Sequence, residues 1–412
     1  MKVLRLSSYC YPEQIASSHL AQDMNEAYEK AGIICEIHAP TPTRGIDEET
    51  RKKYKKIKYE ELNSGFIQIH RFPMFKEPKN SLLRAARYTL CIIMQLLNGL
   101  AAKGIDVYYA SSTPPINGLM FPVLKFFKRY KIIYNLQDIF PDSLVNTGMT
   151  KNGSILWWIG HIVEKITYRF TDKIIVISED FKKNILEKGV PEEKIEVVYN
   201  WIDVEQIKRL ERSDNPIFDE LGLDRNKFYI TYAGNLGFSQ NIRVLLEAAM
   251  LLKENKDINF VIIGNGADED NCRKYIEENA LDNVRMFPMQ PIEKVEQVYN
   301  LGDASLVSCK GGTGGIGMPS KLCSIMSAGR AVLASFDKGT EIERIITENE
   351  TGIFTEADDS QKLADAILRL YNDPEFCIRC GENARRYTVE NLSSEKSTSR
   401  IIQILTETVK ER

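Results

Sequence analysis

Residues 229–237, with the sequence YITYAGNLG, run from a short apolar stretch directly into a turn that glycine brackets on both sides. Short runs rich in aromatic and β-branched residues are typical of buried strands. We expect a strand that ends at Ala233, a turn over residues 234–237, and then a helix that Ser239 caps at its N-terminus. The same strand–turn–helix pattern recurs on both sides of this stretch, and that recurrence indicates the fold class.

Short apolar runs alternate with helical periodicity along most of the chain, which favours parallel sheets covered by helices on both faces. The other strands predicted in the second half are Asn259–Ile263, Val284–Phe287, Ala304–Val307 and Ala331–Ala334. Those predicted in the first half are Val3–Ser7, Cys35–Ala39, Phe66–Arg71, Val107–Ala110, Lys131–Asn135, Lys173–Ile177 and Ile195–Val198. Two consecutive series of this kind predict two doubly wound α/β domains.

The length and composition agree with this organisation. A chain of 412 residues exceeds what one hydrophobic core usually supports. Hydrophobic residues at 43% and charged residues at 27% exclude a disordered, fibrous or disulfide-scaffolded chain. The net charge of −3 gives no bias toward nucleic acid, so no nucleic-acid partner is expected.

Basic residues are concentrated in the first half of the chain. Residues 51–150 carry 16 basic and 6 acidic side chains. Such a bias fits an anionic membrane surface or a phosphate-bearing substrate, and it fits equally a solvated lysine-rich loop over Lys52–Lys58. The longest apolar stretch, Tyr88–Leu100, is too short to span a bilayer.

The cysteines and the N-terminal residues indicate in which cellular compartment the protein is expected. Most of the eight cysteines lie in apolar contexts, which fits a reducing cytoplasm. Cys377 and Cys380 have the spacing of two residues on one helical face. A zinc site would need two more ligands at a matching spacing, and the sequence does not offer them, so no metal site is predicted. We expect no secretory signal at the start of the chain, because Met1–Ser7 already has the pattern of a strand. We expect a cytoplasmic protein.

Three strand-to-helix turns of the second half suit a nucleotide diphosphate, because helix N-termini offer free amides. The first is Gly234–Gly237 and the second is Gly264–Gly266. The third holds five glycines among residues 311–317, followed by Pro319, Ser320 and Lys321. Pro319 suits the start of a helix, Ser320 can cap it, and Lys321 adds a cation. Glycine is also required by ordinary turns, so each turn alone is open to a purely structural interpretation.

The spacing from Thr340 to Glu343 is that of a capping box, which accounts for Glu343 but not for Glu341.

Motifs across nearly the whole chain resemble the retaining nucleotide-sugar glycosyltransferases of family 4. In the second half they are AGNLG at 233–237 with Gln240, GNG at 264–266, GDA at 302–304, PSKL at 319–322, AGR at 328–330 and GTE at 339–341. In the first half they are SSTPP at 111–115, QDIFPDS at 137–143 and NWID at 200–203. The resemblance is closest to the branch that includes N-acetylfucosamine transferases of bacterial O-antigen and capsule synthesis.

The resemblance implies the GT-B fold, in which two Rossmann-like domains face each other across a cleft. It implies an acceptor domain over residues 1–203, a donor domain over 204–385, and a C-terminal helical segment over 386–412 that packs back on the first domain. The reaction would move a sugar, an N-acetylated or deoxy hexosamine, from a UDP-sugar to a saccharide acceptor with retention and without an obligatory metal. Preorganised amides and cations beside the leaving diphosphate would provide electrostatic catalysis.

The resemblance also assigns candidate site residues. Asp138 and Gln137 are the catalytic candidates, and Glu341 belongs to the donor site. The candidates for binding the donor and its phosphates are Gly234, Asn235, Gly237, Gln240, Arg243, Lys310, Pro319, Ser320, Lys321 and Ser324. Those for the region of the base are Gly264, Gly266, Phe287, Pro288 and Met289.

Several positions depart from the family pattern. Asn235 and Gln240 stand where most relatives carry an arginine and a lysine, and Ile316 and Ser324 replace two glutamates. Gln137 replaces a histidine that often precedes Asp138 in relatives. Positive charge at the diphosphate must then come from fewer residues, with Lys321 first and Arg243 or Lys310 in reserve. The departures keep a non-catalytic nucleotide-sugar sensor open as an alternative, and the shared fold keeps open a UDP-sugar 2-epimerase.

The expected acceptor is a saccharide on a polyprenyl diphosphate, as in related enzymes, and the first domain is expected to dock on the inner face of the cell membrane. The features that favour docking are the stretch Tyr88–Leu100 preceded by Arg84 and Arg87, the basic–aromatic run Lys125–Arg129, and the pair Trp157-Trp158.

Overall fold

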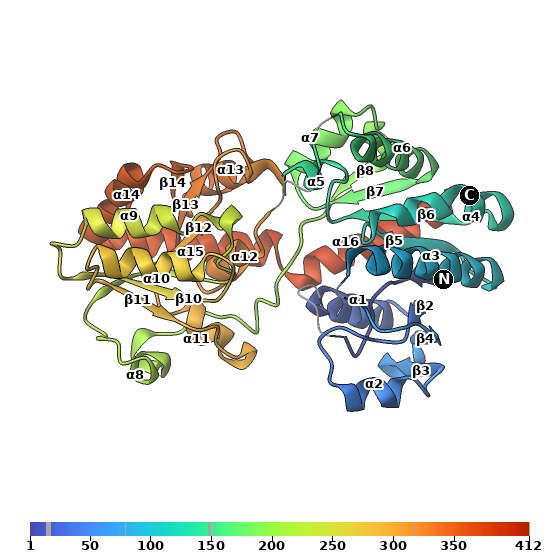
Figure 1. Cartoon of the computed structure of the whole chain (residues 1–412), viewed down its shortest axis with the longest axis horizontal. Helices are drawn as coiled ribbons and strands as arrows, with labels where there is room; N and C mark the ends of the chain where they lie inside the picture. Colours follow the sequence, from blue (N-terminus) through green and yellow to red (C-terminus); the bar gives the residue numbers. More distant parts are fainter. Residues whose placement is uncertain (14–17, 79, 147–149, 152, 317, 412) are drawn as a thin grey trace. The chain divides into compact units, whose positions relative to one another are not determined.

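The computed structural model describes residues 1–13, 18–78, 80–146, 150–151, 153–316 and 318–411 (Figure 1). The chain forms two compact units. Unit 1 comprises residues 1–199 and 395–412, and unit 2 comprises residues 200–394. The expected boundary at residues 385/386 falls inside helix α15 (Pro374–Asn391), which stays in unit 2. The last helix, α16 (Ser394–Lys410), belongs almost wholly to unit 1.

Unit 1 is built on an eight-stranded sheet in the order β3-β4-β2-β1-β5-β6-β7-β8 within the described ranges. Its strands are β1 (Lys2–Leu6), β2 (Ile34–Pro40), β3 (Tyr59–Leu62), β4 (Ile67–Phe72), β5 (Val107–Ser111), β6 (Lys131–Leu136), β7 (Lys173–Val176) and β8 (Ile195–Val197). All pairs are parallel except β3 with β4. The edge strand β3 was not predicted, since its sequence YEEL lacks the continuous apolar run of the buried strands.

The helices of unit 1 connect these strands. They are α1 (Ser18–Lys30), α2 (Glu48–Tyr54), α3 (Ser81–Ala101), α4 (Phe121–Lys128), α5 (Asp142–Asn146), α6 (Ile155–Phe170) and α7 (Glu179–Glu187). Part of the expected lysine-rich loop is therefore helix α2, whose N-cap is Asp47, with the side chain accepting a hydrogen bond from the Thr50 amide at 2.6 Å. The acidic first turn and the basic last turn of α2 complement its dipole.

Unit 2 has a six-stranded, fully parallel sheet in the order β11-β10-β9-β12-β13-β14 among its described residues. The strands are β9 (Phe228–Ala233), β10 (Ile258–Ile263), β11 (Val284–Phe287), β12 (Ala304–Ser308), β13 (Ala331–Phe336) and β14 (Gly352–Glu356). The helices are α8 (Ile217–Glu220), α9 (Arg243–Leu251), α10 (Glu269–Glu278), α11 (Val295–Tyr299), α12 (Ser320–Ser327), α13 (Glu341–Glu348), α14 (Ser360–Asn372) and α15. In chain order this is the 3-2-1-4-5-6 arrangement of Rossmann sheets, with the topological switch between β9 and β12.

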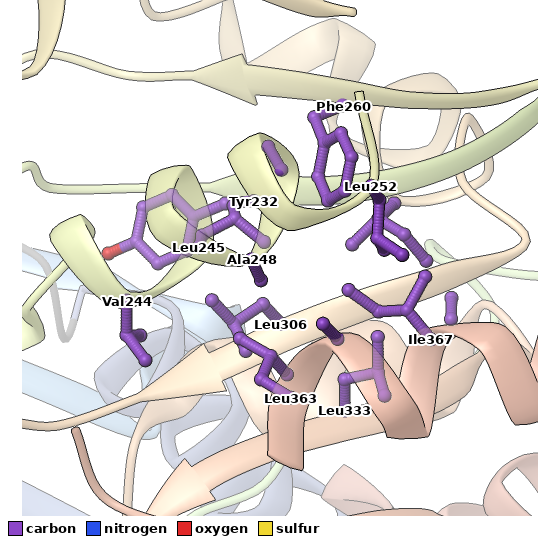
Figure 2. Close-up of a cluster of buried hydrophobic side chains, with 14 of the residues drawn as sticks. Tyr232, Val244, Leu245, Ala248, Leu252, Phe260, Leu306, Leu333, Leu363 and Ile367 are labelled. Carbon is purple, nitrogen blue, oxygen red and sulfur yellow. The ribbon is translucent and has the colours of Figure 1, made fainter. Parts of the chain in front are cut away.

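The main core of unit 2 lies between this sheet and helices α9 and α14. Figure 2 shows Leu245 and Ala248 of α9 and Leu363 and Ile367 of α14 among the buried side chains of the sheet. Tyr232 of β9 lies in this cluster and is fully buried. The apolar runs thus become central strands because both faces are covered, and the predicted fold class of two doubly wound α/β domains is confirmed.

Candidate functional site

The carboxyl ends of β9 and β12 flank the topological switch of unit 2, where open parallel sheets bind ligands. Pairing between these two strands covers Ile230 with Ala304 and Thr231 with Ser305. The loops beyond the strand ends are joined by a hydrogen bond from the Lys310 amide to the Ser239 carbonyl, at 2.8 Å. The first and third predicted glycine turns therefore lie side by side.

The second glycine turn packs against the first. A Cβ atom on Gly264 would lie 1.9 Å from the carbonyl oxygen of Gly234, and one on Gly266 would lie 2.3 Å from that of Leu236. These two positions accept only glycine because another stretch of backbone occupies the space of a side chain. Gly264 and Gly266 thus have a structural reason to be glycine, and they bring the predicted base region up to the first turn.

Lys321 lies over the first turn, although it follows β12 in the chain. Its Nζ would be 3.3 Å from a Cβ atom on Gly234, whose backbone has a φ of 138°. The same Nζ lies 3.6 Å from the centre of the Tyr232 ring and donates a hydrogen bond to the Tyr232 hydroxyl. That hydroxyl donates in turn to the Asn235 carbonyl at 2.7 Å. Tyr232 thus ties the ammonium group to the first turn.

The electrostatics of Lys321 are those of an unneutralised cation. Burial lowers the pKa of Lys321 from 10.5 to about 7. Among the described residues no carboxylate makes an ion pair with it, in contrast to many lysines of unit 2, such as Lys227, Lys294 and Lys338. A half-buried ammonium without a carboxylate is suited to an anionic ligand, which would supply the missing charge.

The start of helix α12 differs from the expectation in one respect. The helix begins at Ser320 with Pro319 as N-cap, and no side chain caps it, so the prediction that Ser320 caps the helix is wrong. Proline at the N-cap position leaves Ser320 as the first helical residue, with its side chain exposed. The amides of the first turn are then available beside Lys321.

Two other predicted caps are also wrong. Helix α9 begins at Arg243, after a short 3-10 turn at Phe238–Gln240, so Ser239 does not cap it. Thr340 is the N-cap of α13, but its hydroxyl donates to the Asp337 carbonyl, and Glu343 accepts from the amide of Gly339 at 2.6 Å. Thr340 therefore occupies the predicted cap position, but the hydrogen bonds of a capping box do not form there.

The amides of the glycine-rich loop are already occupied. Asp337 accepts from Gly312 at 2.9 Å and from Gly314 at 2.7 Å, and Asp358 accepts from Gly311 at 3.1 Å. These three loop amides are thus paired with carboxylates and are not offered to a ligand. Gly317, the last glycine of the predicted cluster, lies outside the described residues.

The remaining donor candidates are placed as follows. Asn235 and Gln240 contact each other at 3.4 Å, and a Cβ atom on Gly237 would lie 2.5 Å from the Gln240 Oε1. Arg243 pairs with Glu247 at 2.9 Å and stacks on Tyr275, so the Glu247 carboxylate already compensates part of its positive charge. Ser324 is hydrogen-bonded to the Tyr299 hydroxyl.

The predicted base-region residues Phe287, Pro288 and Met289 lie at the end of β11. The Phe287 carbonyl accepts from the Gly264 amide at 3.0 Å, which joins them to the second turn. Met289 is exposed, whereas Glu341, the first residue of α13, is buried.

The catalytic candidates lie in unit 1, in the loop after β6. Gln137 receives its position from two hydrogen bonds, one from its amide to the Ser112 hydroxyl at 3.0 Å and one from its side chain to Asn135 at 2.8 Å. Desolvation raises the pKa of Asp138, and a hydrogen bond with Ser143 opposes that shift. A carboxylate whose pKa is moved upward is better suited to accept a proton near neutral pH.

Within the described residues, no cluster of three or more His, Cys, Asp or Glu side chains could hold a metal ion. No described helix has both the length and the apolar character needed to cross a membrane.

Comparisons with known proteins identify the family of this chain. The Glycosyltransferase Family 4 model matches residues 19–206, and the Glycosyl transferases group 1 model matches residues 213–387. The probable glycosyltransferase WbjE of Pseudomonas aeruginosa is 30% identical over 285 residues, which cover 68% of this chain and 70% of that protein. The chain therefore belongs to the family 4-like glycosyltransferases of the GT-B fold.

Two further comparisons extend the likeness. The putative colanic acid biosynthesis glycosyl transferase WcaI of Escherichia coli is 26% identical over 219 residues, which cover 52% of this chain and 53% of that protein. The crystal structure of Anabaena HepE in complex with UDP superimposes with a TM-score of 0.74 at 16% identity, and the match covers 99% of this chain and all of HepE.

Sequence reasoning missed Tyr232, Asp337 and Asp358. Tyr232 has the pattern of an ordinary buried strand residue, and only its position two residues before Gly234 hints at a role. The two aspartates are distant in sequence from the glycine loop that they hold.

Proposed function

We propose that this glycosyltransferase transfers a hexosyl group, an N-acetylated or deoxy hexosamine, from a UDP-sugar to a saccharide on a polyprenyl diphosphate. The observation that carries the donor assignment is the unneutralised Lys321 ammonium over Gly234, beside the free first turn of α12. HepE, which shares the fold, has been crystallised with UDP and with UDP-glucose, which supports the nucleotide. WcaI and its colanic acid pathway support a role in bacterial surface polysaccharide synthesis.

In the proposed reaction the bond between the sugar C1 and the UDP oxygen breaks while the acceptor oxygen bonds to C1 on the same face, so the configuration is retained. The donor phosphate takes the acceptor proton, with Asp138 orienting the acceptor hydroxyl or helping to deprotonate it. Lys321 and the α12 amides stabilise the charge that develops on UDP, and no metal is required. In this proposal Gln137 contacts the donor sugar.

A thermal-shift screen of nucleotide sugars tests the donor assignment, since a ligand that binds only the folded state raises the melting temperature. A shift with UDP and with one or more UDP-hexosamines, followed by release of UDP in the presence of acceptor, supports the transferase. Binding without turnover would instead identify a sensor, and interconversion of two UDP-sugars an epimerase.

Lys321 also makes the affinity for UDP depend on pH. A bound diphosphate favours the ammonium and so raises the pKa of Lys321 above its free value of about 7, and binding above pH 7 then takes up a proton. We expect the affinity to fall as the pH rises above 7, by up to about tenfold per pH unit until the bound pKa is reached. Calorimetry of UDP binding from pH 6.5 to 9 measures this, and Lys321→Met should flatten the profile. An equal slope in the variant would contradict the assignment.

The membrane proposal rests on three neighbouring helices of unit 1, since α4 contacts both α3 and α6 (Figure 1). We call their exposed apolar residues the apolar face. It comprises Leu90, Ile93 and Leu97 of α3, Phe126 and Phe127 of α4, and Ile155, Leu156, Trp158, Ile159 and Ile162 of α6. Phe126 is 78% and Ile155 81% exposed, far from the usual burial of such side chains. Many large exposed apolar side chains on neighbouring helices are typical of an interaction site.

Fewer basic side chains around the apolar face are available to an anionic membrane than the sequence indicates. Lys125 pairs with Asp172 at 2.8 Å, and Lys128 donates to the Ala102 carbonyl at 2.7 Å. Arg87 is fully buried and cannot contact lipid, which corrects that part of the docking prediction. Arg129, Lys165 and Arg169 are exposed and provide the cations for an anionic surface.

Docking on the inner membrane face predicts that the protein sediments with anionic vesicles at low salt and less at high salt. Replacing both Phe126 and Phe127 by serine should lower this binding by about thirtyfold or more, because each buried phenyl ring is worth on the order of 1 kcal/mol or more. Phe238→Ser, at a phenylalanine of unit 2 that is 61% exposed, is the matched control and should bind as the wild type does. Equal partition onto neutral vesicles, or binding to neither kind, would refute this mode of docking.

A further inference from the structure

A cluster of arginine and tyrosine side chains lies at the carboxyl edge of the unit 1 sheet, beyond β1, β2 and β4. We call Tyr9, Arg44, Glu77, Arg84, Arg87 and Tyr88 the arginine cluster. Arg44 makes two hydrogen bonds of 2.7 Å to the Glu77 carboxylate, and Arg84 lies 3.6 Å from the same group. The sequence analysis gave no role to Arg44, Glu77 or Tyr9.

Two tyrosines complete the outer part of the arginine cluster. The hydroxyls of Tyr9 and Tyr88 are 2.6 Å apart, and the Tyr9 hydroxyl donates to Glu77 at 3.2 Å. The guanidinium of Arg44 stacks on the Tyr9 ring at 4.5 Å. Because planar guanidinium groups on fixed supports are typical of phosphate recognition, this geometry is suited to an anion.

Arg87 forms the inner part of the cluster and is fully buried. Its Nε donates to the Phe75 carbonyl at 3.1 Å and its Nη2 to the Thr43 hydroxyl at 3.5 Å, while its Nη1 is buried and has no hydrogen-bond partner among the described residues. A buried cation with an unsatisfied donor is unfavourable unless an anion compensates it.

The carboxylates near the cluster do not neutralise it. Glu77 is shared among the three arginines. Glu13, the other carboxylate of this region, accepts the backbone amides of Cys10, Thr43 and Arg44. Among the described residues, three guanidinium groups therefore lie near two carboxylates. Arg44 and Arg84 are 43% and 44% exposed, so a ligand can reach them.

Helix α3 connects the arginine cluster to the apolar face. Arg84, Arg87 and Tyr88 lie in its first turns, and Leu90, Ile93 and Leu97 of the apolar face follow along the same helix. One element thus presents cations at one end and exposed hydrocarbon along its length. The ligand that matches both is an amphiphile with a multiply charged phosphate head and an apolar chain.

We propose that the arginine cluster binds the diphosphate of the prenyl carrier that bears the acceptor saccharide. Arg44 and Arg84 contact the phosphate oxygens. The buried guanidinium of Arg87 stabilises the negative charge of the bound diphosphate electrostatically. This proposal rests on the lipid-linked acceptor of the proposed function, and it assigns to unit 1 a second phosphate site, separate from the donor site around Lys321.

Farnesyl diphosphate, below its micelle concentration, is the probe. Calorimetry on the full chain with saturating UDP keeps the donor site occupied, so that binding of the probe reports the second site. The wild type is expected to bind farnesyl diphosphate, inorganic pyrophosphate more weakly, and farnesol not at all. Arg44→Gln and Arg84→Gln should each weaken the binding by at least fivefold, with the affinity for UDP unchanged.

Lys52→Gln, which removes an exposed cation of the same unit outside the cluster, is the matched control and should bind the probe as the wild type does. If Arg44→Gln lowers the melting temperature, Arg84→Gln decides, because Arg84 lies 3.6 Å from Glu77, whereas Arg44 makes two hydrogen bonds of 2.7 Å to that carboxylate. Unaltered binding in both variants, binding of the probe only when UDP is omitted, or equal binding of farnesol would overturn the proposal. If the wild type does not bind UDP at all, the donor assignment is wrong instead. Failure of the arginine-cluster proposal and failure of the donor assignment are therefore distinguishable.

Discussion

Replacing Asp138 by asparagine is expected to lower the turnover number by roughly 10²- to 10⁴-fold, the usual contribution of a positioned acid–base group. The side chain follows β6 at the carboxyl edge of the unit 1 sheet, and its raised pKa favours proton transfer. Asparagine keeps the size and the hydrogen bond with Ser143 but cannot accept a proton. Release of UDP from the donor that the thermal-shift screen identifies measures the effect.

Asp142 provides the control for this experiment, since it begins helix α5 directly after this loop and has a structural role. It pairs with Lys188 at 2.9 Å and accepts from Asn184 at 3.2 Å. Asp142→Asn should therefore change the stability and leave most of the turnover intact. If Asp138→Asn folds normally and turns over at the wild-type rate, Asp138 is a loop residue and the catalytic role is wrong.

Replacing Lys321 by alanine is expected to weaken UDP binding by about 1.5–3 kcal/mol, which is roughly ten- to 150-fold in Kd. The reason is the loss of a charge-assisted hydrogen bond from the cation over Gly234 that has no carboxylate partner in the described chain. Lys321→Met, which keeps most of the packing against Tyr232, separates the loss of charge from a cavity effect. Isothermal calorimetry at pH 7 measures both.

Two variants make this result specific. Lys338 pairs with Glu356 in the same unit, so Lys338→Ala should bind UDP as the wild type does. Arg243 is partly neutralised by Glu247 and should contribute less than Lys321. An affinity unchanged in Lys321→Ala but reduced in Arg243→Ala would transfer the phosphate role to Arg243.

The sequence by itself determined the fold class. Apolar runs such as Asn259–Ile263 identify buried parallel strands because only strands covered on both faces are apolar throughout. The glycines at 234, 264 and 266 mark the turns beyond those strands, since backbone approaches backbone there. The edge strand β3, with its mixed sequence, was missed for the same reason, because its partial exposure imposes no apolar pattern.

Only the tertiary structure decided which charged side chains of the site are paired with a carboxylate and which are buried without one. Lys321, Lys125 and Arg243 are equivalent in the sequence, yet only Lys321 lacks a carboxylate partner in the described part of the chain. Its depressed pKa follows from burial beside Tyr232, 89 residues away in the chain. Likewise, Arg87 has the pattern of a surface cation, but folding buries it behind Arg44 and Glu77. Desolvation and pairing depend on which distant segments meet, and a local pattern of residues does not encode that.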